Sequence, residues 1–267
     1  MKQLKLMVLT LTLLMGTMFT SCMDSGESGP QQWAGVVKVN DRMGYVTFTD
    51  AAGTELIPTN TIPVTLNARM AYIYCQVDEG QDLSTNPKSI KITLLADPTG
   101  IDATAITTPK VGESGDVTTN APVGSLSFAL GYSTVAPFQF SENTIVLPVL
   151  YRVKNVTTTE DIKNELAKHT FTLVCYTDDI KSGDTILKLY LRYKVEDEPA
   201  AIAERATRTS SFKAYEISQI LREYTLKSGQ AKPAKITIVA QQNEYNNKLE
   251  DTSTIEKVYE IEYKTAE

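Results

Sequence analysis

A strict alternation of apolar and polar side chains constrains the fold of this 267-residue chain more than any other feature. In residues 187–195 every second residue is apolar, and the residues between them are lysine, tyrosine or arginine. Side chains of an extended strand point alternately to its two faces, so the pattern predicts a strand with one face in a core and one in water. The same alternation occurs in three further segments, residues 145–153, 236–240 and 259–263. The sequence therefore predicts a mostly β protein.

One proline and three short helical patterns modify this picture. Pro148 has no N–H to donate to a neighbouring strand, so the strand over 145–153 is expected to be an edge strand or to carry a bulge. Residues 159–168 begin with a capping threonine and acidic residues and end with lysine, which favours a helix. Residues 198–206 and 216–224 are also expected to be short helices.

The chain divides into segments of different character. Residues 33–97 carry five short strand patterns, the count and scale of a small OB-type β-barrel. Residues 98–123 are rich in Thr, Pro and Gly with little alternation, so they are expected to form a linker. Residues 124–267 carry the long alternating patterns and are expected to form an antiparallel β-sandwich with a few short helices.

The N-terminus has the layout of an export signal. Two lysines precede an almost unbroken apolar run over residues 6–19, and two small residues then precede Cys22. A permanent transmembrane helix needs about 20 apolar residues, so this run is too short to remain as one. Residues 1–21 are therefore expected to be a signal peptide, and the Gly- and Ser-containing residues 22–32 a flexible tether.

The residues before Cys22 resemble the lipobox of bacterial lipoproteins, although Phe19 stands where the commonest pattern has leucine. The resemblance implies that a diacylglyceryl group is attached to the cysteine thiol, that cleavage leaves this cysteine as the first residue, and that acyl chains such as palmitate hold the protein on its membrane. Met23 rather than an aspartate follows the cysteine, so the enterobacterial signal for retention in the inner membrane is missing and the outer membrane is expected. Asp24 and Glu27 resemble the acidic surface-export signal of Bacteroidetes lipoproteins, and the periplasmic or the surface face is left open. The alternative is a secreted protein with a chance cysteine at its cleavage site.

Composition limits the partners. The formal net charge is −6, and it falls to −8 when the signal and its two lysines are removed. A net-acidic surface does not concentrate polyanions, so nucleic acid is not expected as a partner. The expected partners are the membrane, through the lipid anchor, and an envelope protein or glycan.

Residues that carry catalytic or metal chemistry are few and scattered. Cys75 and Cys175 lie in apolar strand patterns and are expected to be buried thiols, with a disulfide between them left open. His169 is the only histidine, and no serine motif of a hydrolase accompanies it. Neither zinc nor calcium ligand spacing occurs. Catalytic residues, metal ions and cofactors are therefore not expected.

Aromatic residues of the barrel are better candidates for a site. Trp33, Tyr72 and Tyr74 are expected either as a platform on which a ligand stacks or as filling of the barrel interior. Separately, Thr185 lies between Asp184 and Ile186, which resembles the Asp-(Ser/Thr)-apolar O-glycosylation sequon of exported Bacteroidetes proteins. Entry into a strand explains this threonine equally well.

Three segments carry a resemblance to a family: LPVLYRV at 147–153, HTFTLVCY at 169–176 and DTILKLYLRY at 184–193. Together with the lipobox and the barrel they resemble the NigD-like lipoproteins of the Bacteroidetes. The resemblance implies an N-terminal OB domain and a C-terminal β-sandwich at the cell envelope, and it brings no catalytic residues.

The function expected from these observations is that of a non-catalytic, membrane-anchored module that binds or assembles with a protein or a glycan. One alternative is a carboxylate-dependent hydrolase acting on envelope or dietary glycan. Another is a passive surface lipoprotein or an immunity-type lipoprotein.

Overall fold

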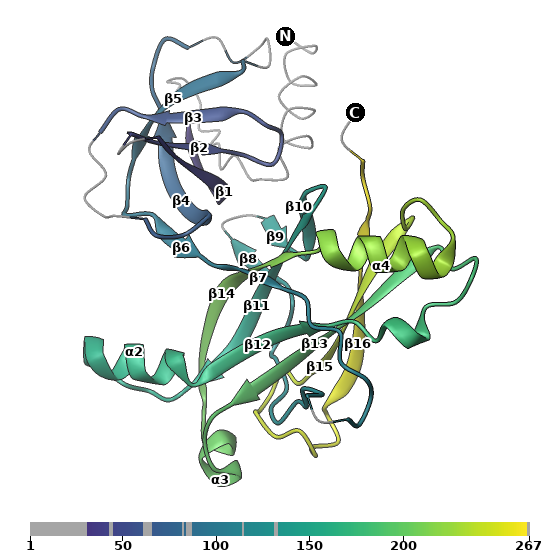
Figure 1. Ribbon diagram of the computed structural model, residues 1–267. Coiled ribbons are helices and arrows are strands. Elements are labelled where there is room, and N and C mark those ends of the chain that lie inside the picture. Colours follow the sequence, from purple (N-terminus) through teal and green to yellow (C-terminus); the bar gives the residue numbers. More distant parts are fainter. Residues whose placement is uncertain are drawn as a thin grey trace. The chain divides into compact units, whose positions relative to one another are not determined.

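The computed structural model describes residues 31–42, 45–60, 66–81, 83, 87–113, 115–130 and 133–265, and these form two compact units (Figure 1). The first unit extends to Ala103 and includes residues 129–134. The second comprises Thr104–Phe128 and Val135–Glu267. Strands dominate both units, so the expectation of a mostly β protein is confirmed.

The first unit is a closed barrel of five strands. In chain order its strands are β1 (Gln32–Arg42), β2 (Tyr45–Thr49), β3 (Glu55–Pro58), β4 (Met70–Val77) and β5 (Ser89–Leu94), with a short β6 (Thr99–Ile101) beside β4. They are neighbours in the order β1-β2-β3-β5-β4, and β1 pairs again with β4. β3 and β5 run parallel, whereas the other neighbours are antiparallel. The expected OB-type barrel is confirmed.

β1 is long enough to pair with both β2 and β4, and this double pairing closes the barrel. Its first part, Gln32–Lys38, pairs with β4, and its last part, Lys38–Arg42, pairs with β2. Alternate residues of the strands then point inward and fill the interior. This interior consists of Trp33, Val37, Phe48, Leu56, Ala71, Ile73, Cys75, Ile90, Ile92 and Leu94.

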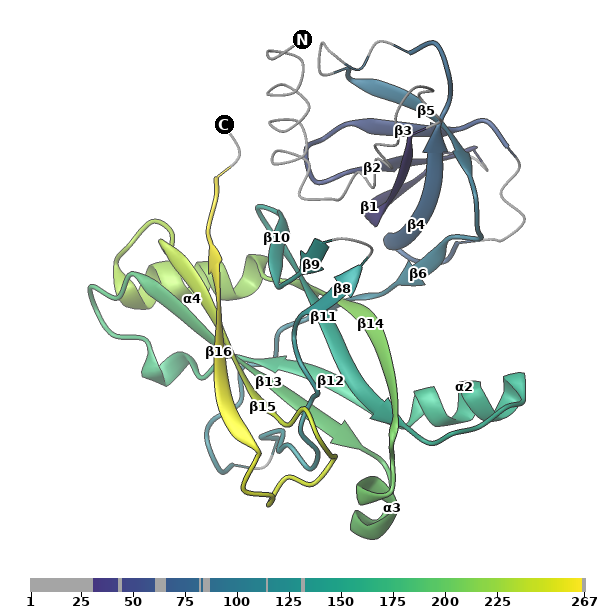
Figure 2. The same cartoon turned by 180° about the vertical axis from the view of Figure 1, so that it is seen from behind.

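The second unit is a sandwich of two four-stranded sheets. One has the order β10 (Phe138–Ser141), β11 (Thr144–Val153), β14 (Thr207–Glu216), β7 (Ala103–Ala105). The other has the order β12 (His169–Val174), β13 (Ile186–Val195), β15 (Lys235–Gln242), β16 (Ile255–Glu262), and β13, β15 and β16 lie side by side in both views (Figures 1 and 2). A separate two-stranded sheet is formed by β8 (Phe128–Leu130) and β9 (Ser133–Val135), of which residues 129–134 are assigned to the first unit.

Apolar residues of both four-stranded sheets belong to one hydrophobic core, which confirms the sandwich. The sandwich is not wholly antiparallel, however, because β13 and β15 are parallel. The chain between them passes through two helices and through β14 in the other sheet, which provides the crossover that parallel neighbours require.

Three helices occur in the described part of the second unit, and a 3₁₀ turn, η1 (Thr177–Asp179), precedes β13. Helix α2 (Thr159–Ala167) is capped by the Thr158 hydroxyl, one residue earlier than the cap expected from the sequence. Helix α3 (Pro199–Ala203) is a short turn. Helix α4 (Ser218–Ser228) ends at Gly229, whose φ of 74° suits a residue without a side chain.

Pro148 lies inside a strand with neighbours on both sides, rather than on an edge strand. On one side β11 pairs with β14 throughout. On the other side β10 pairs only as far as Val146, and Leu150 N–H donates to Ser125 O over 2.8 Å. Pro148 lies between these two contacts, and its nitrogen points to the same side of the strand as that of Leu150. No backbone acceptor of β10 pairs at this position, so the N–H that proline lacks is not needed there.

The segment 98–123 is not the linker that its composition suggests. It contains β6 and β7, and Ile106, Ala121 and Val123 are buried in the core of the second unit. The Asn120 side chain donates to Val195 O over 2.9 Å and accepts from Val195 N–H over 2.8 Å. A few well-spaced apolar residues and backbone pairing fix this segment, and neither produces a strong periodic pattern in the sequence.

Candidate functional site

Tyr72 and Tyr74 lie on the outward face of the barrel, on β4. Their neighbours in the chain, Ile73 and Cys75, point inward and are fully buried, so the two tyrosines point outward. Tyr74 is 37% exposed, and Tyr72 is half-buried. Burial, and then the neighbouring Tyr74, raise the pKa of the Tyr72 hydroxyl.

On the neighbouring strand β1, the buried Val36 lies opposite Tyr72, and small or polar residues follow it on the same face. The register of β1 and β4 places Ala34 opposite Tyr74 and Gln32 opposite Gln76. The Tyr74 hydroxyl donates to the Gln32 side-chain oxygen over 2.5 Å. We call Gln32, Ala34, Tyr72, Tyr74 and Gln76 the tyrosine face. It offers aromatic surface and amide hydrogen-bonding groups, and none of its side chains carries a formal charge.

Trp33, the third aromatic residue of the expected platform, does not belong to this face. It is 5% exposed and packs in the barrel interior, opposite Cys75 in the register of β1 and β4. The alternation of a strand separates Trp33 from Gln32 and Ala34 on its own strand, so it cannot share their face. Of the two alternatives expected for Trp33, a ligand platform or filling of the barrel interior, the second therefore holds.

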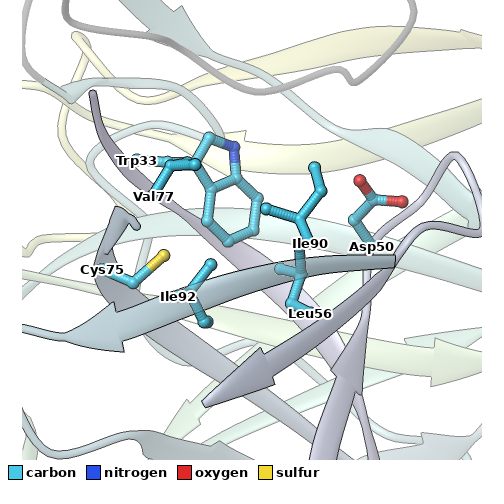
Figure 3. Close-up of a pocket in the computed structure, with 7 residues that line it drawn as sticks. All are labelled: Trp33, Asp50, Leu56, Cys75, Val77, Ile90 and Ile92. Carbon is cyan, nitrogen blue, oxygen red and sulfur yellow. The ribbon is translucent and has the colours of Figure 1, made fainter. Parts of the chain in front are cut away.

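Trp33 instead lines a small cavity in the barrel, shown in Figure 3. Its volume is about 20 Å³, room for about one water molecule, and the wall is mostly aliphatic. The Asp50 carboxylate also lines it and accepts N–H groups of Ala52 and Thr54 at 2.9 and 2.8 Å. Burial raises the pKa of Asp50, although those hydrogen bonds oppose the shift. The cavity is too small for an organic ligand, and Asp50 serves to hold a turn.

The barrel face on which OB folds commonly bind ligands lies on β2 and β3. Here its outward side chains are mainly polar and bonded to one another. Thr47 donates to the Glu55 carboxylate over 2.9 Å, and the Asn40 amide donates to Thr49 over 2.8 Å. Tyr45 on the same strand is 57% exposed. The expectation from the sequence overlooked this polar group, which the alternation in residues 45–49 could have indicated.

His169 belongs to a buried network in the second unit. Its Nδ1 lies 2.6 Å from the Tyr193 hydroxyl and its Nε2 lies 3.3 Å from Glu165 Oε1. A carboxylate can only accept, so Nε2 carries a hydrogen. Burial lowers the pKa of His169, so the imidazole is neutral at neutral pH and Nδ1 accepts from the tyrosine. The His169 side chain is 1% exposed.

Arg205 completes this network. Its Nε and Nη2 donate to the two oxygens of Glu165 over 2.7 and 3.2 Å, and Nη2 also donates to Asp197 over 3.0 Å. Lys154 and Lys168 reach Asp197 as well, at 3.1 and 3.2 Å. The network joins α2, β12, β13 and the residues after α3. It locks these elements together because a buried charge requires its partners to stay in place.

The pKa values in the network follow from these contacts. Burial raises the pKa of Glu165, but hydrogen bonds from Lys154 N–H, Arg205 and His169 outweigh it and the net shift is downward. Burial lowers the pKa of His169 despite the opposing contact with Glu165. Hydrogen bonds from Arg205 and the two lysines lower the pKa of Asp197. The network therefore holds a neutral histidine beside an ion pair that is fully charged at neutral pH.

The two described cysteines are buried free thiols in separate cores, Cys75 in the barrel and Cys175 in the sandwich. This confirms the expectation of core thiols. Burial raises the pKa of each thiol to about 12. A thiol with that pKa is almost wholly protonated at neutral pH and is a poor nucleophile.

Two candidate residues remain, Thr185 and Cys22. Thr185 is exposed and precedes β13 directly. It is accessible to a glycosylating enzyme, and its modification stays a prediction. Cys22 lies outside the described residues. Within the described ranges, no three His, Cys, Asp or Glu side chains gather as metal ligands, and no helix is both long and apolar enough to cross a membrane.

Searches of family models and of curated proteins give no match to this chain. Among solved structures, one from Bacteroides fragilis that is provisionally described as a lipoprotein matches at 95% identity and a TM-score of 0.82, covering 89% of this chain and all of that chain. A Bacteroides vulgatus protein of the DUF1344 group matches at 11% identity and a TM-score of 0.54, over 87% of this chain and 91% of that one. A NigD-like immunity protein from Bacteroides caccae matches at 10% identity and a TM-score of 0.49, over 84% and 90%.

An OB-type barrel followed by a β-sandwich is thus the fold of this chain, and the Bacteroides vulgatus match shares this fold. This chain belongs to the family of the Bacteroides fragilis lipoprotein and is anchored in the cell envelope. The predicted kinship with lipoproteins of the Bacteroidetes is confirmed.

Proposed function

We propose that this lipoprotein is a non-catalytic binding module of the outer membrane, and that the tyrosine face of its barrel contacts a neutral glycan. The observation that carries the proposal is the exposed ring of Tyr74 beside the small side chain of Ala34. A ring next to a short side chain leaves aromatic surface on which the apolar face of a sugar ring can lie.

The polar groups of the tyrosine face suit the same ligand. Gln32 and Gln76 are opposite each other, one step along the strands from Tyr74, and supply amide donors and acceptors. The Tyr74 hydroxyl, which donates to the Gln32 side-chain oxygen, can still accept a hydrogen bond. Sugar hydroxyls need both donors and acceptors, whereas a phosphate or sulfate needs cations. The uncharged face on a net-acidic chain therefore favours a neutral ligand.

The environment of the reactive groups supports a role without catalysis. A general base must reach the proton that it removes, but the His169 side chain is enclosed and both its nitrogens are engaged. The thiols of Cys75 and Cys175 are buried and protonated. Glycoside hydrolysis needs two carboxyl groups facing each other across a cleft, but Glu165 and Asp197 are both bonded to Arg205.

Calorimetric titration of the purified full chain with neutral oligosaccharides of glucose, mannose, xylose and N-acetylglucosamine tests the proposal. We expect one of them to bind, and Tyr74→Ala to weaken binding by roughly tenfold or more, the loss of about one stacking contact. Tyr245→Ala removes a tyrosine that is 77% exposed in the second unit and should leave affinity unchanged.

Two further variants separate binding from catalysis. His169→Ala should bind the same oligosaccharide as the wild type, with only lower thermal stability. Turnover of any oligosaccharide that His169→Ala abolishes while the fold is kept would contradict the non-catalytic proposal. If no neutral oligosaccharide binds and a photo-crosslinker at position 74 captures no partner in cells, the tyrosine face is not the binding surface.

A further inference from the structure

Two arginines face each other on the outer side of the sandwich. Arg152 of β11 is directly opposite Arg208 of β14 in the antiparallel register. Tyr151 and Val153, the neighbours of Arg152 in the chain, point into the core, so Arg152 points to the other face of its sheet. Like charges directly opposite in a sheet destabilise it, so the pair calls for a compensating group.

The contacts within the protein do not supply that compensation. Arg152 donates through Nη1 to Ala206 O over 3.2 Å and through Nη2 to Glu244 O over 2.6 Å. Arg208 donates through Nη2 to the same Glu244 oxygen over 2.7 Å. A peptide carbonyl is a neutral dipole. In the described residues, neither guanidinium has a carboxylate oxygen within 4.0 Å, and the Glu244 carboxylate itself accepts from the Gln242 amide.

Burial makes the missing anion costly. Arg152 is only 7% exposed, and its buried Nε–H has no hydrogen-bond partner. Burial and the charge of Arg208 both lower the pKa of the Arg152 guanidinium. Arg208 is exposed, so the two cations form a positively charged pair that extends from the interior to the surface.

Arg205, three residues before Arg208, is a second buried arginine, and its hydrogen-bond partners can be compared with those of Arg152. Arg205 has both oxygens of Glu165 and one of Asp197 as partners. The fold therefore provides carboxylates for Arg205 and only carbonyl oxygens for Arg152. A counter-ion from outside the chain explains the difference.

We infer that Arg152 and Arg208 form a binding site for a small oxyanion, a carboxylate or a phosphate group. A guanidinium presents five N–H donors in a planar fork that matches the oxygens of either group. Arg208 uses one donor within the protein and offers the rest to the surface. Arg152 lies behind it and contributes its charge. The site lies in the second unit and does not depend on the proposed tyrosine face.

The test is thermal unfolding of the full chain in neutral detergent at pH 7.5, with sodium phosphate, sodium acetate or sodium chloride at matched ionic strength. We expect a saturable rise in Tm with phosphate or with acetate, and no such rise with chloride. A response to phosphate alone identifies a phosphoryl ligand, and a response to acetate alone identifies a carboxylate. A rise with both anions shows that the site recognises the oxygen atoms that carboxylate and phosphate groups have in common.

Arg208→Gln should weaken the responding anion at least tenfold, because it removes the charge-assisted donors at the surface. Arg208→Lys keeps the charge but loses the fork, and should give an intermediate affinity. Arg222→Gln removes an exposed arginine on α4 and should bind as the wild type does. The inference is overturned if neither anion acts beyond chloride, or if Arg208→Gln retains the affinity of the wild type.

Discussion

His169 and Tyr193 are diagonal neighbours on β12 and β13, and a 2.6 Å hydrogen bond joins the imidazole Nδ1 to the phenol oxygen. Both residues are buried, and Glu165 holds the other imidazole nitrogen. The only histidine of the chain is therefore a fixed, neutral part of the sandwich core.

Tyr193→Phe should destabilise the second unit by about 1–3 kcal/mol, because Nδ1 of His169 then stays buried without a donor. The ring itself, which stacks on Phe171 at a centroid distance of 4.6 Å, is kept. Urea unfolding followed by circular dichroism measures the change. Tyr190→Phe, on the same strand but half-buried on the other face, is the matched control and should cost less.

Stability should fall as the solution is acidified from neutral pH, in two stages. The pKa of His169 is lowered by burial, so below its ordinary value of 6.5 the unfolded chain binds the proton more readily than the folded one. The pKa of Glu165 is also lowered, so a second loss should begin below its ordinary value of 4.5. Urea unfolding between pH 8 and pH 3 measures both.

His169→Gln should remove the first stage and leave the second. A wild-type stability that stays constant between pH 7 and pH 5 would show that His169 has the same pKa in the folded and the unfolded chain.

Trp33→Ala should destabilise the barrel by about 3–5 kcal/mol, the usual cost of removing a large aromatic side chain from a core. Trp33 is the only tryptophan in the chain and is 5% exposed. Its fluorescence in the wild type should therefore be blue-shifted and resist quenching by acrylamide. A red-shifted, readily quenched emission would instead place Trp33 on the surface.

Trypsin should cut the folded protein at Lys110, in an exposed turn of the segment 98–123. The two products should remain together on gel filtration, because Ile106 and Val123 on either side of the cut are buried in the same core. Lys110→Gln should remove this cleavage. Separation of the products without denaturant would restore the interpretation of this segment as a linker.

Cys22→Ala should move the protein from the membrane pellet to the soluble or unprocessed fraction, because the thiol that the lipid requires is gone. Fractionation of cells followed by immunoblotting is the measurement. Cys75→Ala serves as the control and should leave membrane attachment unchanged. A mature Cys22→Ala protein that still pelleted with membranes would disprove anchoring at this residue.

The sequence by itself determined the strands. The alternation of apolar and polar residues depends only on neighbouring residues, and it is the same however the strands are later paired. The patterns in 145–153 and 187–195 became β11 and β13 within one residue, and the five patterns of 33–97 became the barrel. The placement of Tyr72 and Tyr74 on one face of their strand followed from their spacing of two, whereas the sequence did not decide that this face is the outward one.

Only the tertiary structure decided which face of a strand lies inside, where Pro148 fits and which buried side chains meet, because these features depend on pairing between distant residues. Closure of β1 onto β4 put Trp33 inside the barrel, although alternation alone allowed either face of that strand to be the inner one. Pairing with β10 and Ser125 left the gap that accommodates Pro148. Glu165 and Arg205 are 40 residues apart, and the contact of Arg152 with Glu244 spans 92. No local pattern encodes such contacts, because they form only when the sheets and their connections come together.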